Sequence, residues 1–486
     1  MKRKFILNLI LVIFLNLLVK PFWVFGIDRT VQNVVGAEQY GFYFALFNFS
    51  LILNILLDLG ITNYNNRHIS QNESNISLYF SNILSLRLIL GVVYFAASML
   101  AAWLCNYDRL QIQMLMLLTL NQFLLALILY FRSNIAGLQM FKTDSFVSVL
   151  DRLVLIIVCS LLLWGNITNS PFRIEWFVYA QTGAYLFTAA VAFILVLIHA
   201  KDFKLTFNLR FSVDILKKSF PFALLTLLMS LYNRIDSVML ERLLPDGKIQ
   251  AGIYAQAFRI SDACCMFALL FANLLLPMFS RMLKQRENVA GLLKLSTVAM
   301  AVPVVAGAAM CVFYRQPVME LLYSSHASDS APVFAFLISG FVAISMVYIY
   351  GTLLTANGSL RQLNIVAFCG MVFNIAMNFV LIPRYGALGA AIVSLATQSL
   401  TAFAQIAIAF SIFGLKFRGH TQFMLLLYVL GIAAFGFATT HLPFGWTCNA
   451  LIMLAASGLL AVALRLIKIK DFVGIITKTE IHKPNK

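Results

Sequence analysis

The stretch Gly36-Ala37-Glu38-Gln39-Tyr40-Gly41-Phe42-Tyr43 returns 211 residues later as Gly247-Lys248-Ile249-Gln250-Ala251-Gly252-Ile253-Tyr254. The copies share Gly, Gln, Gly and Tyr at the same spacing, and the match continues with Phe47 and Phe258, then with Ser50 and Ser261. Each copy stands where a long apolar segment begins. This pattern indicates a duplicated helical bundle, an arrangement in which many secondary transporters build one substrate path between two halves.

The composition requires a membrane protein. Hydrophobic residues make up 61% of the 486 residues, charged residues only 11%, and the mean hydropathy is +0.87. A soluble domain needs more polar surface than this chain supplies. A spanning helix needs about 20 apolar residues. Such stretches are predicted at 5–27, 41–64, 78–104, 112–135, 146–165, 176–198, 220–244, 253–279, 292–314, 331–357, 362–382, 386–413, 422–441 and 445–467. We therefore expect an all-α membrane protein with about 14 transmembrane helices.

The basic residues indicate the orientation of the chain. The 36 Lys and Arg residues exceed the 19 Asp and Glu residues, for a net charge of +17. They concentrate on one side of the membrane if both termini and the even-numbered connections are cytoplasmic, as the positive-inside rule requires. We expect a multi-pass protein of the cell inner (plasma) membrane with both termini cytoplasmic. Attraction to anionic membrane lipids accounts for the remaining basic character, and no nucleic-acid partner is expected.

The repeat also predicts the domain organisation. It relates the second predicted span to the eighth, so the halves contain six spans each and share one orientation. We expect an N-terminal lobe at 1–200, a cytoplasmic connecting segment at 201–219, a C-terminal lobe at 220–413, and two additional helices with a cytoplasmic tail at 414–486. Two such parallel six-helix repeats would form a two-lobed bundle with a central cavity, and rocking of the lobes would give alternating access.

Polar side chains inside the predicted spans are the candidate functional residues. A cation costs about 2.5–3.5 kcal/mol at a helix centre, so each should face a wet cavity or another side chain. The cations are Lys20, Arg87, Arg234 and Arg259, the acids are Asp58, Asp236 and Asp262, and the amides are Asn54, Asn374 and Asn378. The charged positions fall in predicted spans one, two, three, seven and eight, and the repeat makes spans one and two equivalent to seven and eight. A common cationic cleft is therefore expected, which indicates an anionic substrate group.

Local spacing leaves alternatives open for these charges. Arg259 and Asp262 stand three apart on one helical face, where they can simply pair. Arg234 and Asp236 diverge by roughly 200° on a helix and cannot satisfy each other. Asn54 and Asp58 stand four apart on one face of the span 41–64. For every charge, a structural salt bridge between helices is the alternative to substrate binding.

The absent motifs narrow the function further. No G-x-x-x-x-G-K-[ST] sequence occurs, so ATP hydrolysis is not expected. No long loop carries paired carboxylates or a Ser/His arrangement, which disfavours an enzyme. The seven cysteines show no metal-ligand spacing. We expect no catalytic residues, no metal site and no cofactor.

Two segments resemble a known family. Val34 to Tyr43, continuing to Asp58-Leu59-Gly60-Ile61, resembles the beginning of the second helix of bacterial polysaccharide exporters. The segment from Asn374 to Ala391, which contains Pro383-Arg384-Tyr385-Gly386, is similar to the eleventh and twelfth helices of lipid-linked oligosaccharide flippases. These are the Wzx-type transporters of O-antigen, lipopolysaccharide or capsule units, in the MATE-like exporter superfamily. The resemblance extends from about residue 5 to about residue 470. Pro383 cannot extend a helix, so a tight turn is predicted there.

The resemblance implies a flippase that moves an undecaprenyl-pyrophosphate-linked oligosaccharide from the cytoplasmic to the outer leaflet. Arg234 and Arg87, then Lys20 and Arg259, would hold the pyrophosphate, with the acids orienting them or binding a Na⁺ or H⁺ coupling ion. Polysaccharide assembly proteins are the partners that this family suggests. Three alternatives remain: a cation-coupled drug or metabolite exporter of the same superfamily, a flippase of the peptidoglycan lipid precursor, and, from another class, a membrane glycosyltransferase.

Overall fold

The computed structural model describes residues 19, 21–59, 61, 76–138, 140–165, 170–199, 207–415 and 419–466. All regular secondary structure in these residues is helical. Eleven of the described helices are long and apolar enough to cross a membrane. The expected fold class, an all-α membrane protein, is confirmed.

The chain divides into two compact units, residues 1–259 with 367–390, and residues 260–366 with 391–486. Up to the end of α8, the helices are η1 (Phe22–Asp28), α2 (Arg29–Ile52), η2 (Asn54–Leu57), α4 (Ile76–Leu104), α5 (Arg109–Gly137), α6 (Phe141–Trp164), α7 (Ile174–His199) and α8 (Leu209–Leu243). After α8 follow α9 (Gly247–Lys284), α10 (Ala290–Phe313), α11 (Arg315–Leu322), α12 (Ala327–Ala356), α13 (Leu360–Phe413), α14 (Gly419–Thr440) and α15 (Trp446–Ala463). Both α9 and α13 contribute residues to each unit. The predicted lobes and connecting segment stay a prediction.

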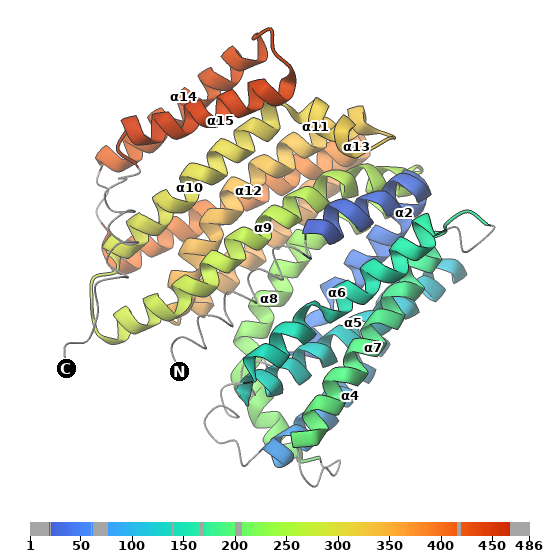
Figure 1. Cartoon of the computed structure of the whole chain (residues 1–486). Helices are drawn as coiled ribbons and strands as arrows, with labels where there is room; N and C mark the ends of the chain where they lie inside the picture. The colour runs from blue at the N-terminus through green and yellow to red at the C-terminus, as the bar shows by residue number, and fades with distance from the viewer. Residues whose placement is uncertain are drawn as a thin grey trace. The chain divides into compact units, whose positions relative to one another are not determined.

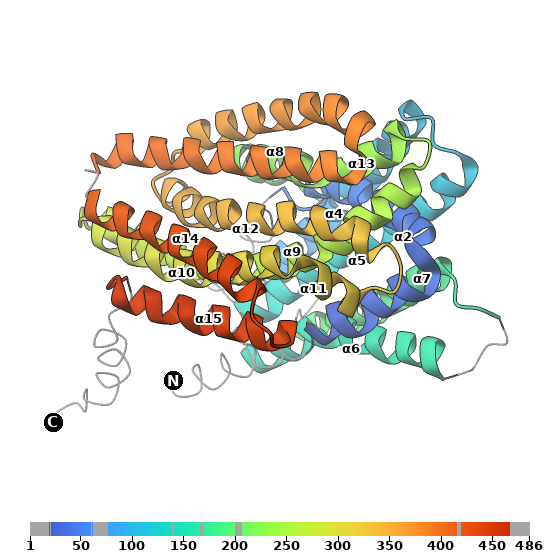
Figure 2. The same ribbon diagram turned by 90° about the horizontal axis from the view of Figure 1, so that it is seen from above.

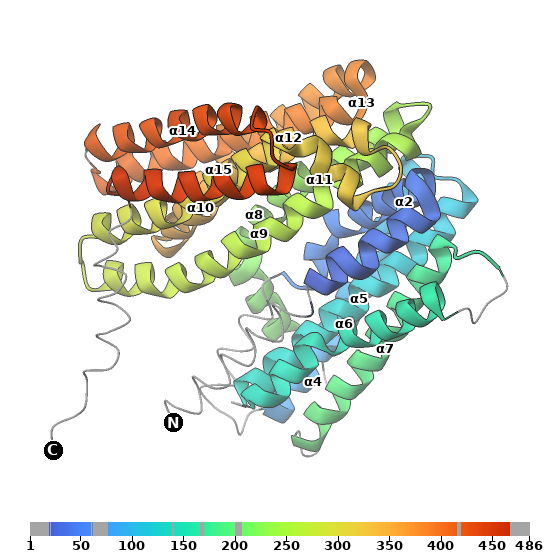
Figure 3. The ribbon, with the colours of Figure 1, turned by 45° about the horizontal axis from the view of Figure 1, so that its top comes forward.

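In the first unit, α7 runs beside α5 and α6, and α2 packs against α5 and α8 (Figures 1 and 3). Aromatic rings fill much of this interior. Phe80 of α4 stacks on Tyr130 of α5 with ring centroids 5.8 Å apart, and the Tyr130 hydroxyl donates to the Phe80 carbonyl over 3.0 Å. The Tyr hydroxyl thereby finds a polar partner in an apolar core, as a buried Tyr requires.

In the second unit, α10 packs against α12, and α14 and α15 lie together along α10 (Figure 2). Tyr428 of α14 is buried and donates to the Val302 carbonyl of α10 over 3.1 Å. That carbonyl lies one residue before Pro303, inside α10. The two helices predicted as a C-terminal addition thus pack firmly on this unit.

The repeat found in the sequence has a counterpart in side-chain geometry. Tyr43 stacks on Phe47 with centroids 5.7 Å apart at 25°, and Tyr254 stacks on Phe258 with centroids 5.7 Å apart at 24°. Equivalent residues of the two copies therefore adopt the same local arrangement.

The number of spans and two of their boundaries differ from the prediction. The first predicted span, 5–27, lies mostly outside the described residues. In the second predicted span, 41–64, the α-helix ends at Ile52 and a short 3₁₀ turn follows at Asn54–Leu57, and residues 62–64 lie outside the described residues. In α13 the helical run continues through Pro383 and breaks at Gly386 (φ 57°, ψ −135°), so the predicted turn falls at its last residue. The count of 14 is not confirmed.

Candidate functional site

Asp28, Tyr40 and Arg259 form a buried cluster inside the first unit. The Tyr40 hydroxyl donates to the Asp28 carboxylate, whose two oxygens lie 2.9 and 3.0 Å away. Arg259 Nε donates to the Tyr40 oxygen over 3.0 Å and lies 3.4 Å from Asp28 Oδ2. The Asp28 side chain is only 3% exposed and that of Arg259 16% exposed. An acid and a cation removed from water compensate each other in this way.

Asp28 reaches this position through an unusual local structure. It ends η1, a π-helical segment that follows Pro21. Proline has no amide hydrogen and disturbs the regular helical hydrogen bonds around it, and wide π-turns recur at functional sites. Sequence reasoning missed Asp28 because the first span was predicted to end at residue 27. A boundary tolerance of two to four residues would have included it.

A second part of the network joins Arg152 to this cluster. Gln181 of α7 donates to the Tyr43 hydroxyl over 2.9 Å, and the Tyr43 ring meets Tyr40 edge-on at 5.5 Å. One turn after Gln181, the Tyr185 hydroxyl accepts from Arg152 Nη1 over 3.3 Å. The sequence analysis also missed Arg152, although it lies within the predicted span 146–165.

Arg152 has further partners in the same unit. Its guanidinium lies 5.4 Å from the Trp23 ring centroid, and its Nε is 3.6 Å from the carboxylate of Asp151. Flat aromatic faces attract a desolvated guanidinium. An ionisable residue in a spanning helix is by default a candidate functional residue, so Arg152 joins the candidates.

Arg234 enters the same network from α8. Its Nη1 donates to Asn48 Oδ1 over 3.3 Å, and its guanidinium lies 5.3 Å from the Phe258 ring centroid. Phe258 meets Phe44 at 5.8 Å, and Arg259 lies 5.3 Å from the Phe44 centroid. Arg152 also connects to Tyr43 through Trp23, whose ring stacks on Phe177, which meets Tyr43 edge-on. A series of contacts thus connects the three arginines 152, 234 and 259.

Asp236, Asn374 and Asn378 were predicted separately, and the structure brings them together. Asn378 Nδ2 donates to Asp236 Oδ1 over 2.7 Å and to Asn374 Oδ1 over 3.1 Å. The Tyr254 hydroxyl donates to the other carboxylate oxygen of Asp236 over 2.9 Å. All three predicted residues are at most 1% exposed. Tyr254, whose ring stacks on Phe258, links this carboxylate to the arginine network.

Arg87 and Asp58, also predicted, lie apart from this network and form an ion pair with each other. Arg87 is 1% exposed, donates to the carbonyls of Leu57 and Ala126, and lies 4.8 Å from the Tyr130 ring centroid. Such thorough coordination favours a structural role for Arg87. Helix α2 ends at Ile52, before Asn54, so Asn54 and Asp58 do not share a face of an α-helix.

The remaining predicted residues add little to the site. Asn54 donates to Gln122 of α5 over 2.8 Å. Asp262 is half-buried on α9, in the second unit. Arg259 forms its ion pair with Asp28, a partner that the spacing on α9 did not suggest. Lys20 lies outside the described residues. Among the described residues no group of three His, Cys, Asp or Glu side chains is placed to hold a metal ion.

Residues 8–283 match the model of the family described as "Polysaccharide biosynthesis protein", more than half of the chain. The chain belongs to this family. Among the relatives of this chain, the lipid III flippase of Escherichia coli (strain K12) is 29% identical over 180 residues, 36% of this chain and 43% of the flippase. An uncharacterized membrane protein of Methanocaldococcus jannaschii is 23% identical over 384 residues, 75% of this chain and 88% of that protein.

Solved structures of transporters share the fold of this chain. The lipid II flippase MurJ, in an inward closed conformation, matches with a TM-score of 0.71 at 15% identity, over 96% of this chain and 100% of MurJ. An inward-facing multidrug resistance MATE family transporter of the MOP superfamily matches with a TM-score of 0.63 at 17% identity, over 82% of this chain and 94% of that chain. The MATE-like fold expected from the resemblance is confirmed.

Proposed function

We propose that this protein is a flippase that carries a polyprenyl-pyrophosphate-linked oligosaccharide from the cytoplasmic to the outer leaflet of the inner membrane by alternating access. The observation that carries the proposal is the network of Arg152, Arg234 and Arg259 inside the membrane helices of the first unit. A guanidinium presents a planar fork of donors that matches phosphate oxygens bidentately. Three of them in one aromatic- and amide-lined network suit a pyrophosphate joined to sugars.

The residues around the arginines favour this substrate over a cationic drug. Arg259 and Arg152 each have one acid beside them, Asp28 and Asp151, so acids do not outnumber cations in the network. A cationic ligand needs an excess of negative charge in a low-dielectric site. The family description and the lipid III flippase relative point toward polysaccharide assembly, which supports an oligosaccharide rather than a peptidoglycan precursor.

Asp236 is proposed as the residue that binds a coupling ion. Its carboxylate is buried among neutral partners, Tyr254 and Asn378. Asn378 Oδ1 is buried without a hydrogen-bond partner in the described residues, so an acceptor oxygen lies on the same side chain that contacts this carboxylate. Na⁺ binding or protonation at this carboxylate would remove a buried charge. A membrane potential that is negative inside favours outward movement of a headgroup with two negative charges by about 4–5 kcal/mol per 100 mV.

The direct test is complementation of a strain that lacks its own flippase. Wild-type protein should restore surface polysaccharide and prevent accumulation of lipid-linked repeat units. Arg234→Ala should reduce export at least tenfold at a normal protein level. Arg281→Ala, an exposed arginine near the end of α9, is the matched control and should complement fully. Full complementation by Arg234→Ala, or failure of the wild type to clear the accumulated lipid, would refute the assignment.

A further inference from the structure

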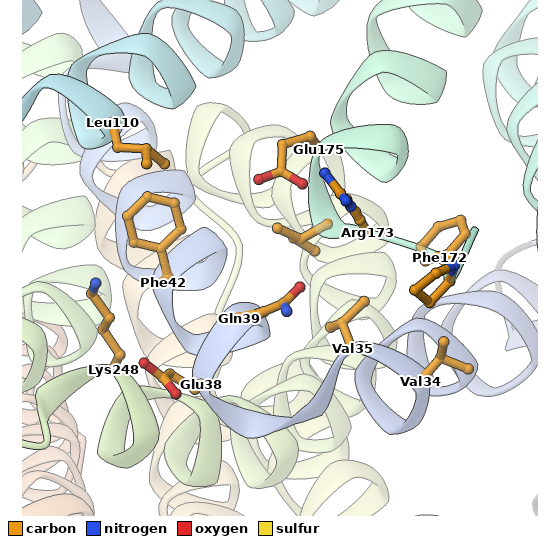
Figure 4. Close-up of a pocket in the computed structure, with 12 residues that line it drawn as sticks. Val34, Val35, Glu38, Gln39, Phe42, Leu110, Phe172, Arg173, Glu175 and Lys248 are labelled. Carbon is orange, nitrogen blue, oxygen red and sulfur yellow. The ribbon is translucent and has the colours of Figure 1, made fainter.

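A cavity of about 440 Å³, whose lining includes none of the three arginines of the network, opens in the first unit (Figure 4). It lies where α5, α7 and α9 begin, beside the break at Gly36 in α2. All of these segments belong to connections that the positive-inside pattern assigns to the extracytoplasmic side. A volume of this size falls within the range of small-ligand sites, about 300–1,000 Å³.

The two copies of the repeat differ in what the equivalent glutamines contact. In the second copy, Gln250 Oε1 accepts from the Ala387 amide over 3.0 Å and lies against Gly386, so the side chain is in direct contact with the turn. Its equivalent, Gln39, instead lines the cavity opposite the segment Pro171–Glu175. Figure 4 shows Gln39 extending from α2 toward the part of the chain that carries Arg173. Gln250 thus contacts the turn in the second copy, whereas Gln39 lines the cavity in the first.

The residues around the cavity indicate the chemistry of its ligand. Two acids, Glu38 and Glu175, and two cations, Arg173 and Lys248, line it together, so their formal charges cancel. Such a site offers both donors and acceptors without a strong preference for an anion. The rings of Phe42 and Phe172 add apolar faces, and the Lys248 ammonium lies 5.2 Å from the Phe42 centroid. Carbohydrates combine hydroxyls that donate and accept with apolar C–H faces, and they suit this lining.

We propose that the cavity between Gln39 and the Pro171–Glu175 segment binds sugar residues of the transported glycan as they leave on the extracytoplasmic side. The inference rests on the proposed flippase function and assigns to it a second, exit-side subsite. An anionic phospholipid headgroup is disfavoured because the formal charges of the two carboxylates and the two cations cancel, so the lining gives a phosphate no net attraction.

Photo-crosslinking in cells that make the native lipid-linked glycan tests the assignment. A benzophenone amino acid replaces Phe172 in the cavity or, as a matched control, Phe187, an exposed residue of α7. After irradiation, periodate–hydrazide labelling detects sugar on the purified protein, and release of ester-linked fatty acids detects phospholipid, because a polyprenyl carrier has no such esters. The expected result is at least fivefold more sugar at position 172 than at 187. Equal sugar at both positions, or phospholipid alone at 172, would overturn the assignment.

A substitution of Gln39 tests whether its side-chain amide contributes to sugar binding in the cavity. Gln39→Leu should lower the sugar adduct at position 172 at least threefold, whereas Gln285→Leu, in the turn after α9, should leave it unchanged. An unchanged adduct in Gln39→Leu contradicts the proposed contact. Export of the glycan is followed in the same cells. If export is normal and position 172 gains no sugar, the subsite is wrong and the function stands; if the wild type restores no export, both are wrong.

Discussion

Gly41 of α2 and Gly252 of α9 hold two helix backbones in direct contact. A Cβ atom on Gly41 would lie 1.9 Å from the Lys248 carbonyl oxygen, and one on Gly252 would lie 2.0 Å from the Ala37 carbonyl oxygen. Gly41 and Gly252 are equivalent in the repeat, and so are Ala37 and Lys248. Each glycine therefore packs against the other helix at the residue one turn before the equivalent glycine. The contact is close to two-fold symmetric. Small residues permit such close approach of membrane helices.

Gly41→Ala is expected to separate these helices and to destabilise the protein by about 1–3 kcal/mol, the usual cost of overpacking. Gly252→Ala should have the same effect, because its Cβ meets the equivalent atom. The control is Gly183→Ala in α7, where an added Cβ has no atom within 4 Å. Thermal unfolding in detergent measures the change. Unaltered melting of Gly41→Ala would show that the two helices are not in contact in the membrane.

The ion pair of Asp28 and Arg259 predicts non-additive stability effects. Removing one partner of a buried pair leaves an uncompensated charge and costs about 3–5 kcal/mol. Asp28→Ala should therefore be strongly destabilising, and Asp28→Ala combined with Arg259→Ala should be less destabilising than the sum of the two single changes. A double-mutant cycle on unfolding of the purified protein measures the coupling. Simple additivity would mean that the two side chains do not interact.

Arg87 should be required for folding more than for transport. Arg87→Ala leaves Asp58 without its cation, so the protein level should fall at least fivefold. Arg132→Ala is the control, because Arg132 pairs with Asp144 at 2.8 Å in a more exposed setting, 26% and 21%. Pairs of that kind contribute about 1 kcal/mol or less. Immunoblots of membranes compare the protein levels of the two variants. A normal protein level of Arg87→Ala together with lost export would instead assign Arg87 to substrate binding.

The sequence predicted the parts of this molecule that depend on local pattern. Helix positions followed from apolar runs, and the repeat identified equivalent positions before their common geometry was known. Asp236, Asn374 and Asn378 were selected because polar residues in spans are costly. Their meeting with Tyr254 depends on tertiary packing, which single-helix spacing does not encode. For the same reason, spacing on α9 suggests only Asp262 as a partner of Arg259. Asp28 is missing from the predicted site because the first predicted span ends at residue 27, one residue before it.

Asp236→Asn tests the proposed coupling ion. Asparagine keeps the size of the side chain and one acceptor oxygen, but it loses the second acceptor and the charge that would attract Na⁺ or a proton. Export of the lipid-linked glycan should depend on Na⁺ or on the pH gradient in the wild type and lose that dependence in the variant, with a rate at least tenfold lower. Transport is measured in membrane vesicles with an imposed gradient. An ion dependence that persists in Asp236→Asn would remove this residue from the coupling mechanism.

Gly386→Ala should disrupt the break in α13 for two separable reasons. The φ of 57° with ψ of −135° is accessible to glycine but strained for alanine, and strain of this type costs about 1–3 kcal/mol. In addition, the new Cβ would lie 2.5 Å from Gln250 Oε1 and displace the side chain that accepts from Ala387. Gly358→Ala separates the two effects, because Gly358 also has a positive φ of 78° but no atom within 4 Å of an added Cβ.

Unfolding of the purified variants should show a larger loss of stability at position 386 than at 358. Shortening Gln250 to Ala in the Gly386→Ala background should recover part of that difference, since it removes the clashing atom. Equal losses at both positions, with no recovery, would mean that the turn and Gln250 are not in contact.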